Sequence, residues 1–373
     1  MRRADLIPLI AGSGVGVTIG IAGAQTAPTG TPYKIGLTAP LTGPLSSIGA
    51  SFVPALQLAV ADVNRRGGVK GHPLEVVVED TQGTPQGGVA ALRKLADVDG
   101  VRACVTGFSN VIGAQIPLSN QLHIILLAPL ESAGVMSAGQ YSFSHAVTFP
   151  ELAPYFRAYW QHVKAKRVFA FLANNAYGQS IAPFVADAAK AGGAAYDQAF
   201  VDLSATDVRG VVARAKEFNP DQVFVAIQGT LLEPAVIRAL REVDVTAQIV
   251  VPGTWFQQRS WRAAAGPYAE GIVFGGLVVD PVKAHDFYHA YLDKTGNEPN
   301  YGDAELYDMG HMLAYAIRKG GYDGDGMRKA LLTMRGVRSV FGGDVAMQED
   351  HYSKFSSLGL WQVRVGKLVS VKT

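Results

Sequence analysis

The sequence predicts an α/β fold made of two lobes, each built on a doubly wound parallel sheet. Strand-like and helix-like segments alternate between residues 33 and 128, and the same alternation repeats between residues 151 and 251. Such alternation is typical of parallel sheets covered by helices on both faces. The 373 residues are also enough for two domains of ordinary size.

The stretch 52–85 is the most clearly delimited unit in the chain. Apolar side chains recur at helical spacing within residues 55–64, which predicts a helix with one buried stripe. Gly67 and Gly68 end that helix, because glycine tolerates the left-handed conformation of a helix terminus. Residues 74–78 are rich in β-branched side chains and predict the next strand.

The other predicted elements continue this order along the chain. The further strands of the first half are 33–38, 102–107 and 123–128, and its helices are 85–96 and 112–121. In the second half the strands are 167–173, 195–200, 222–227 and 248–251, and the helices are 151–163, 177–191, 205–218 and 231–243. The tail adds strands at 272–279, 341–347, 358–365 and 368–371 and helices at 283–294 and 301–319. These late elements fit either lobe, so the chain can cross between the lobes more than once.

Charge and the N-terminus indicate an exported protein. The net charge is +2, from 33 basic and 31 acidic residues, so we expect no nucleic-acid partner. Arg2 and Arg3 precede an apolar segment at 6–21, and small residues follow at 22–24. This layout predicts a signal peptide over residues 1–24 and a periplasmic location; the alternative is an anchoring helix that stays attached.

The sequence shows no apparatus for catalysis. It has no phosphate-binding loop, no dinucleotide fingerprint after a strand and no nucleophile elbow. His285 and His289 have metal-ligand spacing but lack a third ligand, and Cys104, the single cysteine, lies in an apolar strand. We therefore expect no enzyme activity, no cofactor and no metal.

Polar and aromatic residues gather in the loops that follow the predicted strands. Ligands of doubly wound sheets bind outside the carboxyl ends of the strands. Four of these residues, Ser109, Asn110, Ser132 and Thr230, equally suit ordinary helix N-caps, but six such loops together favour a ligand cleft. The candidate ligand-binding residues are Ile48, Phe108, Ser109, Asn110, Leu130, Glu131, Ser132, Tyr177, Gln228, Thr230, Thr254 and Trp255.

Several motifs carry a family resemblance. They are Ala-Pro-Leu-Thr-Gly-Pro at 39–44 with Gly49, Ala-Val-Ala-Asp-Val-Asn-Arg-Arg-Gly-Gly-Val-Lys-Gly at 59–71, Glu79-Asp80 with Pro85, Tyr177-Gly178, Ala-Glu-Gly at 269–271 and Tyr307-Asp308. With these motifs the sequence resembles the periplasmic solute-binding proteins of ABC importers, in the branched-chain amino acid (leucine/isoleucine/valine-binding) group. The resemblance covers nearly everything after residue 30.

The resemblance implies a type I periplasmic-binding fold with two lobes joined by three crossings. Lobe 1 is then expected over 25–147 and 278–350, and lobe 2 over 148–277 and 351–373. It implies a protein, expected to be a monomer, that closes on a small-molecule ligand and presents the closed form to an ABC-transporter membrane permease. A receptor lobe that reports its ligand to a signalling partner is the alternative.

The resemblance also implies ligand contacts. Contacts to a ligand's α-carboxylate and α-ammonium would fall on Ser109, Asn110 or Val111 and on Leu130 and Ser132, and Tyr177 would be the cleft tyrosine. The chain departs from the amino-acid binders where they place a tyrosine and an acid, because it has Gly229-Thr230 and Gly253-Thr254 there. Unless Glu131 substitutes, a buried ammonium would lack its partner. Trp255, Phe256 and Phe108 suit an aromatic or otherwise apolar ligand with a carboxylate or amide, so an amino acid and such a compound both remain open.

Overall fold

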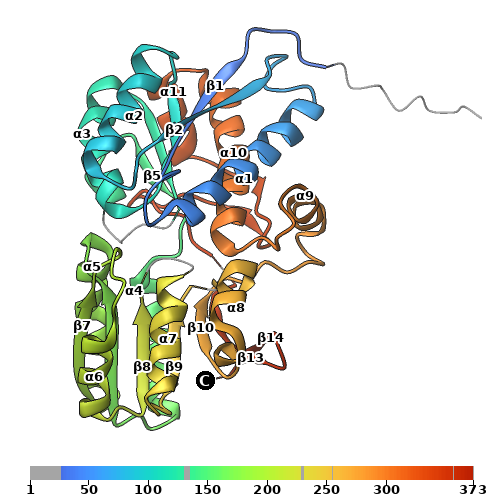
Figure 1. Ribbon diagram of the computed structural model, residues 1–373. Coiled ribbons are helices and arrows are strands. Elements are labelled where there is room, and N and C mark those ends of the chain that lie inside the picture. The colour runs from blue at the N-terminus through green and yellow to red at the C-terminus, as the bar shows by residue number, and fades with distance from the viewer. Residues whose placement is uncertain (1–26, 130–134, 228–230, 254, 356, 373) are drawn as a thin grey trace, which may run out of the picture.

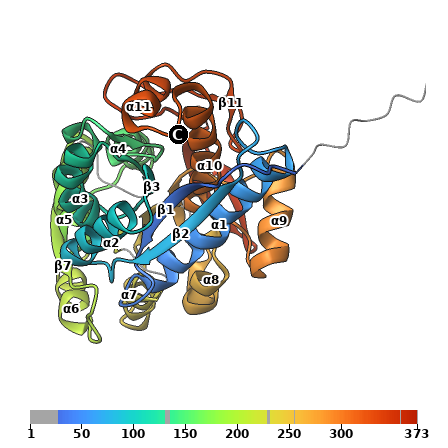
Figure 2. The same cartoon turned by 90° about the horizontal axis from the view of Figure 1, so that it is seen from above.

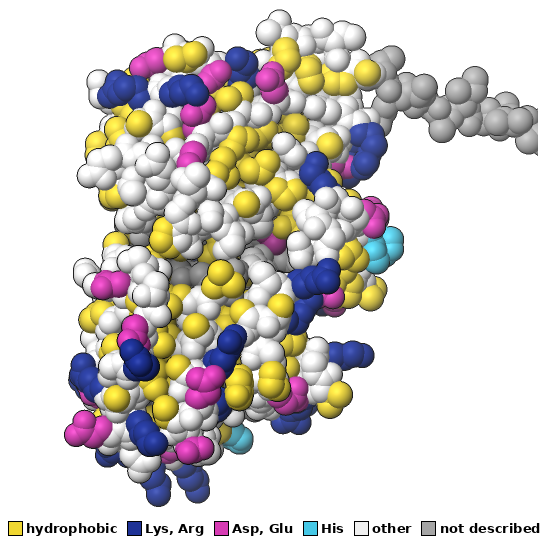
Figure 3. Space-filling view, in the orientation of Figure 1, with side chains coloured by type: hydrophobic (Ala, Val, Ile, Leu, Met, Phe, Trp, Pro, Cys, Tyr) yellow, Lys and Arg dark blue, Asp and Glu magenta, His cyan; other side chains and the backbone are white. Residues whose placement is uncertain are grey.

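The molecule has two parallel-sheet lobes that meet at a narrow waist (Figure 1). The computed structural model describes residues 27–129, 135–227, 231–253, 255–355 and 357–372. On the face seen in Figure 3, acidic and basic side chains are scattered over both lobes rather than gathered in one patch.

Lobe 1 is built on a five-stranded sheet in which every neighbouring pair is parallel. Its strands, in spatial order, are β2 (Leu74–Asp80), β1 (Tyr33–Ala39), β3 (Ala103–Val105), β4 (Ile125–Ala128) and β5 (Ser142–Ser144). Its helices are α1 (Ser46–Arg65), α2 (Pro85–Asp97), α3 (Ser109–Leu122), η1 (Met136–Ala138), α9 (His285–Thr295), α10 (Tyr301–Gly320) and α11 (Gly324–Leu332). A short pair, β11 (Val337–Arg338) and β12 (Asp344–Val345), completes it.

The strands of lobe 1 are apolar on both faces because helices cover both. Cys104 and Leu126 pack in one cluster with α2 and α3, whereas Val105 and Leu127 pack in another with α1 and α10. Figure 2 shows the sheet between these two helix pairs. Such double burial is what continuous apolar strands require.

Lobe 2 is built on a seven-stranded sheet, parallel except at the edge that holds β13 and β14. Its strands, in spatial order, are β14 (Lys367–Val371), β13 (Gly359–Arg364), β10 (Val273–Gly276), β9 (Gln248–Pro252), β8 (Gln222–Ala226), β6 (Arg167–Ala173) and β7 (Ala195–Val201). Its helices are α4 (Phe149–His162), α5 (Ala176–Ala191), α6 (Arg209–Phe218), α7 (Leu232–Glu242), η2 (Trp255–Gln257), α8 (Arg259–Ala265) and η3 (Gly266–Ala269).

The helix–turn–strand unit predicted at 52–85 forms α1, a turn and β2. Gly67 and Gly68 have φ of 91° and 71°, the left-handed values that favour glycine at a helix end. Among the described helices, α1 alone is long and apolar enough to cross a membrane, but half of its most apolar window is buried within lobe 1. That burial is typical of a core helix.

The chain passes between the lobes after β5, between β10 and α9, and before β13. His145, in the first passage, is 2.6 Å through Nδ1 from Ser353 Oγ and 3.1 Å through Nε2 from Asp308 Oδ2 on α10. Ser339 Oγ donates to the same Asp308 oxygen at 2.6 Å. This buried network therefore ties the first and third passages to α10. The residue limits expected for the two lobes stay a prediction.

Some predicted elements differ from the structure. The strand expected at 341–347 contains Gly342 and Gly343, whose φ values of 95° and 76° form the turn between β11 and β12 instead. The predictions missed β5, α8 and α11. β5 has only three residues, and α8 has seven, so both are shorter than the stretches over which a strand or helix period can be recognised.

Candidate ligand-binding site

An apolar pocket of about 50 Å³ lies at the carboxyl ends of β8, β9 and β10 in lobe 2. This is the edge at which ligands of doubly wound sheets bind. Its described lining residues are Val147, Phe149, Leu152, Tyr177, Ile181, Ala226, Ile227, Glu233, Pro252, Gly253, Trp255, Gly275, Gly276 and Tyr301.

Tyr301 closes the pocket from lobe 1. The side chain of Asn300 caps α10 by accepting hydrogen bonds from the amides of its first turn, which fixes where Tyr301 begins the helix. The Tyr301 ring lies 5.4 Å from the Trp255 ring, centroid to centroid. Gly253 has φ +88°, and a Cβ there would lie 2.8 Å from the Tyr301 hydroxyl, so this position requires glycine.

Tyr177 lines the pocket from the first turn of α5. The Asn175 side chain accepts a hydrogen bond from the Gly178 amide at 3.1 Å and starts the helix there. Burial raises the pKa values of both the Tyr177 hydroxyl and the Tyr301 hydroxyl. Both hydroxyls therefore stay protonated and can donate a hydrogen bond.

Glu233 is a buried acid in this apolar surrounding. It lies in the first turn of α7, is 1% exposed, and accepts a hydrogen bond from Trp261 Nε1 at 2.9 Å. Burial raises the pKa of the Glu233 carboxyl well above its usual value, although the bonds from Trp261 and the Ile227 backbone oppose this. Burial therefore favours the neutral form of the carboxyl. The described lining contains no Lys, Arg or His.

The sequence predictions did not include Glu233 and Tyr301, because both lie within helices rather than in strand-end loops. A signal for each exists. Asn300 and Asp303 form a capping box that marks the start of α10 beside Tyr301. Glu233 occupies the apolar stripe of α7, at helical spacing from Val236, Ile237 and Leu240, where an acid is unexpected.

Two of the predicted site residues, Tyr177 and Trp255, line the pocket. Ile48 and Phe108 are each 1% exposed and belong to the core of lobe 1. The Phe108 ring stacks on Phe52 with centroids 6.0 Å apart, so it is committed to packing rather than to this pocket.

Ser109 and Asn110 begin α3, and they do not act as its N-cap. The cap residue is Phe108, which has φ +70° and gives no side-chain cap bond. Asn110 Nδ2 instead donates to the Gly83 carbonyl at 3.0 Å, which joins α3 to the loop after β2. α3 also contacts α5 across the gap between the lobes. Leu130, Glu131, Ser132, Gln228, Thr230 and Thr254 lie outside the described residues.

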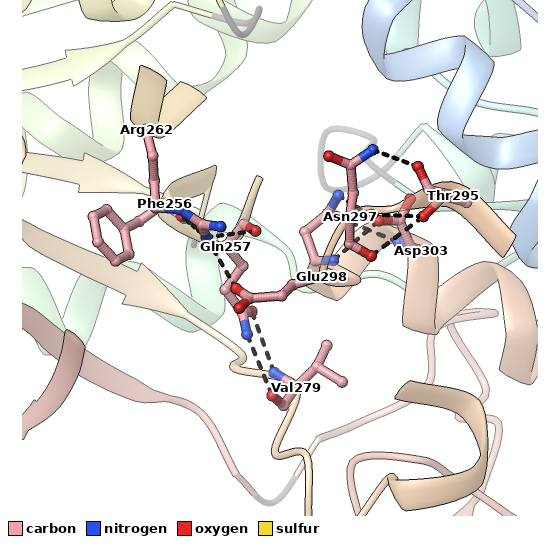
Figure 4. Close-up of polar contacts among 9 residues, drawn as sticks. Phe256, Gln257, Arg262, Val279, Thr295, Asn297, Glu298 and Asp303 are labelled. Atoms are coloured by element: carbon pink, nitrogen blue, oxygen red, sulfur yellow. Dashed lines mark hydrogen bonds and ion pairs between the residues drawn. The ribbon is translucent and has the colours of Figure 1, made fainter. Parts of the chain in front are cut away.

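Beside the pocket, α8 is tied to lobe 1 (Figure 4). Arg262 Nη1 donates to the carbonyls of Phe256 and Gln257 at 2.9 Å and pairs with Glu298 Oε2 at 3.0 Å. Glu298 belongs to the segment between α9 and α10, so this ion pair spans the two lobes. The Gln257 side chain exchanges two 3.3 Å hydrogen bonds with the Val279 backbone, which holds the second passage.

No metal centre is present among the residues that the structure describes: no three His, Cys, Asp or Glu side chains gather closely enough. The rings of His285 and His289 lie 4.6 Å apart on α9, and the His285 side chain is 69% exposed. This pair is therefore part of a solvated helix face.

Comparisons with known proteins agree with this architecture. The periplasmic binding protein family model matches residues 32–364. The Leu/Ile/Val-binding protein homolog 3 of Brucella melitensis is 26% identical over 335 residues, which span 85% of this chain and 84% of that protein.

Solved structures show the same fold. The branched-chain amino acid transporter substrate binding protein LivJ of Streptococcus pneumoniae, in complex with isoleucine, superposes with a TM-score of 0.81 at 21% identity. That match covers 91% of this chain and 100% of LivJ. A solute binding protein of an ABC transporter from Rhodopseudomonas palustris, in complex with 3,4-dihydroxy benzoic acid, gives a TM-score of 0.81 at 20% identity, covering 91% of this chain and 96% of that one.

The chain belongs to the periplasmic binding protein family. Because that family consists of non-enzymatic solute-binding proteins, the predicted fold class, the solute-binding function and the expected lack of catalysis are confirmed. The branched-chain amino acid subtype is not decided by relatives at this identity.

Proposed function

We propose that the chain captures a small organic carboxylate between its lobes and delivers it to the permease of an ABC importer. The observation that carries this proposal is the apolar pocket at the strand ends of lobe 2, which Tyr301 closes from lobe 1. Its walls can desolvate an apolar ligand body, while the Tyr177 and Tyr301 hydroxyls fix its orientation.

The carboxylate end of the ligand would face lobe 1. The described lining of the lobe 2 pocket offers a carboxylate no cation, and burial favours the neutral form of its one acid, Glu233. The N-terminus of α3 carries a partial positive charge, and Ser109 stands in its first turn. Since α3 contacts α5, this end of lobe 1 lies close to the helix that carries Tyr177.

Solved relatives bound to an amino acid and to an aromatic acid both support a carboxylate as the ligand. LivJ was solved with isoleucine and the Rhodopseudomonas palustris protein with 3,4-dihydroxy benzoic acid, and both ligands carry one. Closure of the lobes on the ligand would then distinguish the loaded form, which the permease recognises.

Thermal unfolding with a panel of carboxylates tests this function. The panel holds leucine, isoleucine, valine, benzoate and 3,4-dihydroxybenzoate. A ligand present at about 100 times its Kd stabilises the folded state by about 2.7 kcal/mol, which is a clear rise in Tm. If no carboxylate raises Tm, the proposed function is wrong.

For the ligand that raises Tm most, Tyr177→Phe should weaken binding about fivefold in calorimetry, since it removes one neutral hydrogen bond worth about 1 kcal/mol. Tyr268→Phe, outside the described pocket lining, is the matched control and should leave Kd unchanged. Equal Kd values for both variants and the parent would place the ligand elsewhere.

A further inference from the structure

We propose that Glu233 forms a subsite at the lobe 2 end of the pocket that hydrogen-bonds a neutral hydroxyl group of the ligand, so the preferred ligand is a hydroxylated aromatic carboxylate. This inference rests on the proposed function, because it takes the pocket to be part of the ligand site.

Glu233 keeps hydrogen-bonding capacity beyond its two internal bonds. Its Oε1 accepts the 2.9 Å bond from the indole of Trp261, which is itself 0% exposed, and the Ile227 backbone gives the carboxyl a second hydrogen bond. A protonated carboxyl also has an O–H donor and lone pairs that these two bonds do not use, and Glu233 lines the pocket wall.

The charges of the pocket select the ligand group. A ligand carboxylate at this end would find no Lys, Arg or His in the described lining. A ligand ammonium would require Glu233 to ionise among apolar side chains, which its raised pKa opposes. A hydroxyl can both donate and accept, so it suits a neutral carboxyl beside the protonated hydroxyls of Tyr177 and Tyr301.

The pocket has room for a ligand group. Its volume of about 50 Å³ is several times the roughly 10–15 Å³ that a cavity needs to hold one water. A hydroxyl substituent therefore fits inside. The ring that carries it would lie toward the lobe boundary, where Trp255 and Tyr301 meet at 5.4 Å.

The test compares benzoate with para-hydroxybenzoate and 3,4-dihydroxybenzoate by calorimetry. The parent protein should bind at least one hydroxylated acid about 10- to 100-fold more tightly than benzoate, as expected when a buried hydrogen-bonding site meets its partner. Glu233→Leu should bring that ratio close to one, and Glu233→Gln, which keeps an acceptor for Trp261, should retain part of it. Glu242→Leu and Glu242→Gln, at the exposed end of the same helix, should keep the full ratio.

Two results would overturn the inference. The first is an unchanged preference in Glu233→Leu whose only effect is a lower Tm, which shows a structural role. The second is uptake or release of a full proton on binding, seen as a dependence of the binding enthalpy on the buffer, because the subsite as proposed stays neutral.

The panel also separates this inference from the proposed function. Stabilisation by leucine, isoleucine or valine with none by the aromatic acids overturns the Glu233 subsite and leaves the function standing. Stabilisation by no carboxylate overturns both.

Discussion

At the scale of single residues, Asp303 makes stability depend on pH. It is 1% exposed, and its Oδ2 accepts from the backbone amide of Asn300 at 3.0 Å and from its side chain at 2.6 Å. Burial raises the pKa of Asp303 from 3.8 to about 7, against the opposing effect of hydrogen bonds from Asn300, Ser51 and Tyr291. The folded state therefore holds a proton that the unfolded chain has already released.

Between about pH 4 and pH 7 the folded state binds more protons at Asp303 than the unfolded state does. The contribution of this residue to the free energy of unfolding therefore falls as pH rises, by at most about 1.4 kcal/mol per pH unit, and levels off above about pH 7. Asp303→Asn keeps the acceptor for Asn300 but cannot ionise.

We expect Asp303→Asn to gain stability relative to the parent as pH rises from 5 to 8, measured by urea unfolding at each pH. Asp286→Asn serves as the control, because the Asp286 carboxyl is 99% exposed. Its free energy of unfolding should change with pH as that of the parent does. A constant difference between Asp303→Asn and the parent across this pH range would contradict the prediction.

The residue scale also shows what sequence reasoning can find. Tyr177 and Trp255 were predicted because they follow strands, and the strand-end rule needs only the order of elements. Phe108 obeyed the same rule, but its ring turned into the core against Phe52. Glu233 and Tyr301 reach the pocket through the packing of whole helices, which the order of elements does not specify.

At the scale of elements, local signals were sufficient where an element is long and delimited. α1 ends before the glycine pair at 67–68 and β2 follows it, as predicted, although α1 begins already at Ser46, before the predicted stretch. β5, in contrast, exists because residues 142–144 pair with β4, and the sequence of three residues carries no period. The position of a short strand is therefore determined by the strand with which it pairs.

The start of α5 gives a test of close packing at this scale. A Cβ on Gly178 would lie 1.9 Å from the Ala173 carbonyl oxygen, a backbone atom that cannot rotate away. Gly178→Ala should therefore destabilise the protein by about 1–3 kcal/mol and displace the neighbouring Tyr177.

Gly210 in α6 is the matched control, because a Cβ there would meet no atom within 4 Å. Gly210→Ala should be neutral or stabilise by up to about 1 kcal/mol, since alanine favours helix. Chemical denaturation of both variants measures the difference, and similar stabilities would show that α5 can shift its first turn freely.

At the scale of the whole molecule, the two lobes are joined by covalent passages and by non-covalent contacts of different kinds. His145, Asp308 and Ser353 form a buried network at the waist. The Arg262–Glu298 pair, in contrast, lies near the surface, with side chains 30% and 42% exposed. The buried network fixes where the lobes meet, whereas the exposed pair can open when the lobes separate.

An ion pair of this exposure is worth at most about 1 kcal/mol, and salt screens it. If closure preserves the pair and opening breaks it, Glu298→Gln shifts the equilibrium toward the open form by that amount. Ligand affinity should then fall by no more than about fivefold, because binding draws on the closed form.

Calorimetry at low and high salt measures this effect. The parent should lose affinity as salt rises and approach Glu298→Gln, whose own affinity should depend less on salt. Asp207→Asn removes an exposed ion pair with Arg209 within lobe 2. This variant should change neither the ligand affinity nor its dependence on salt. If Glu298→Gln binds as tightly as the parent at low salt, the pair does not contribute to closure, and other contacts between the lobes, such as that between the Trp255 and Tyr301 rings, hold the closed form.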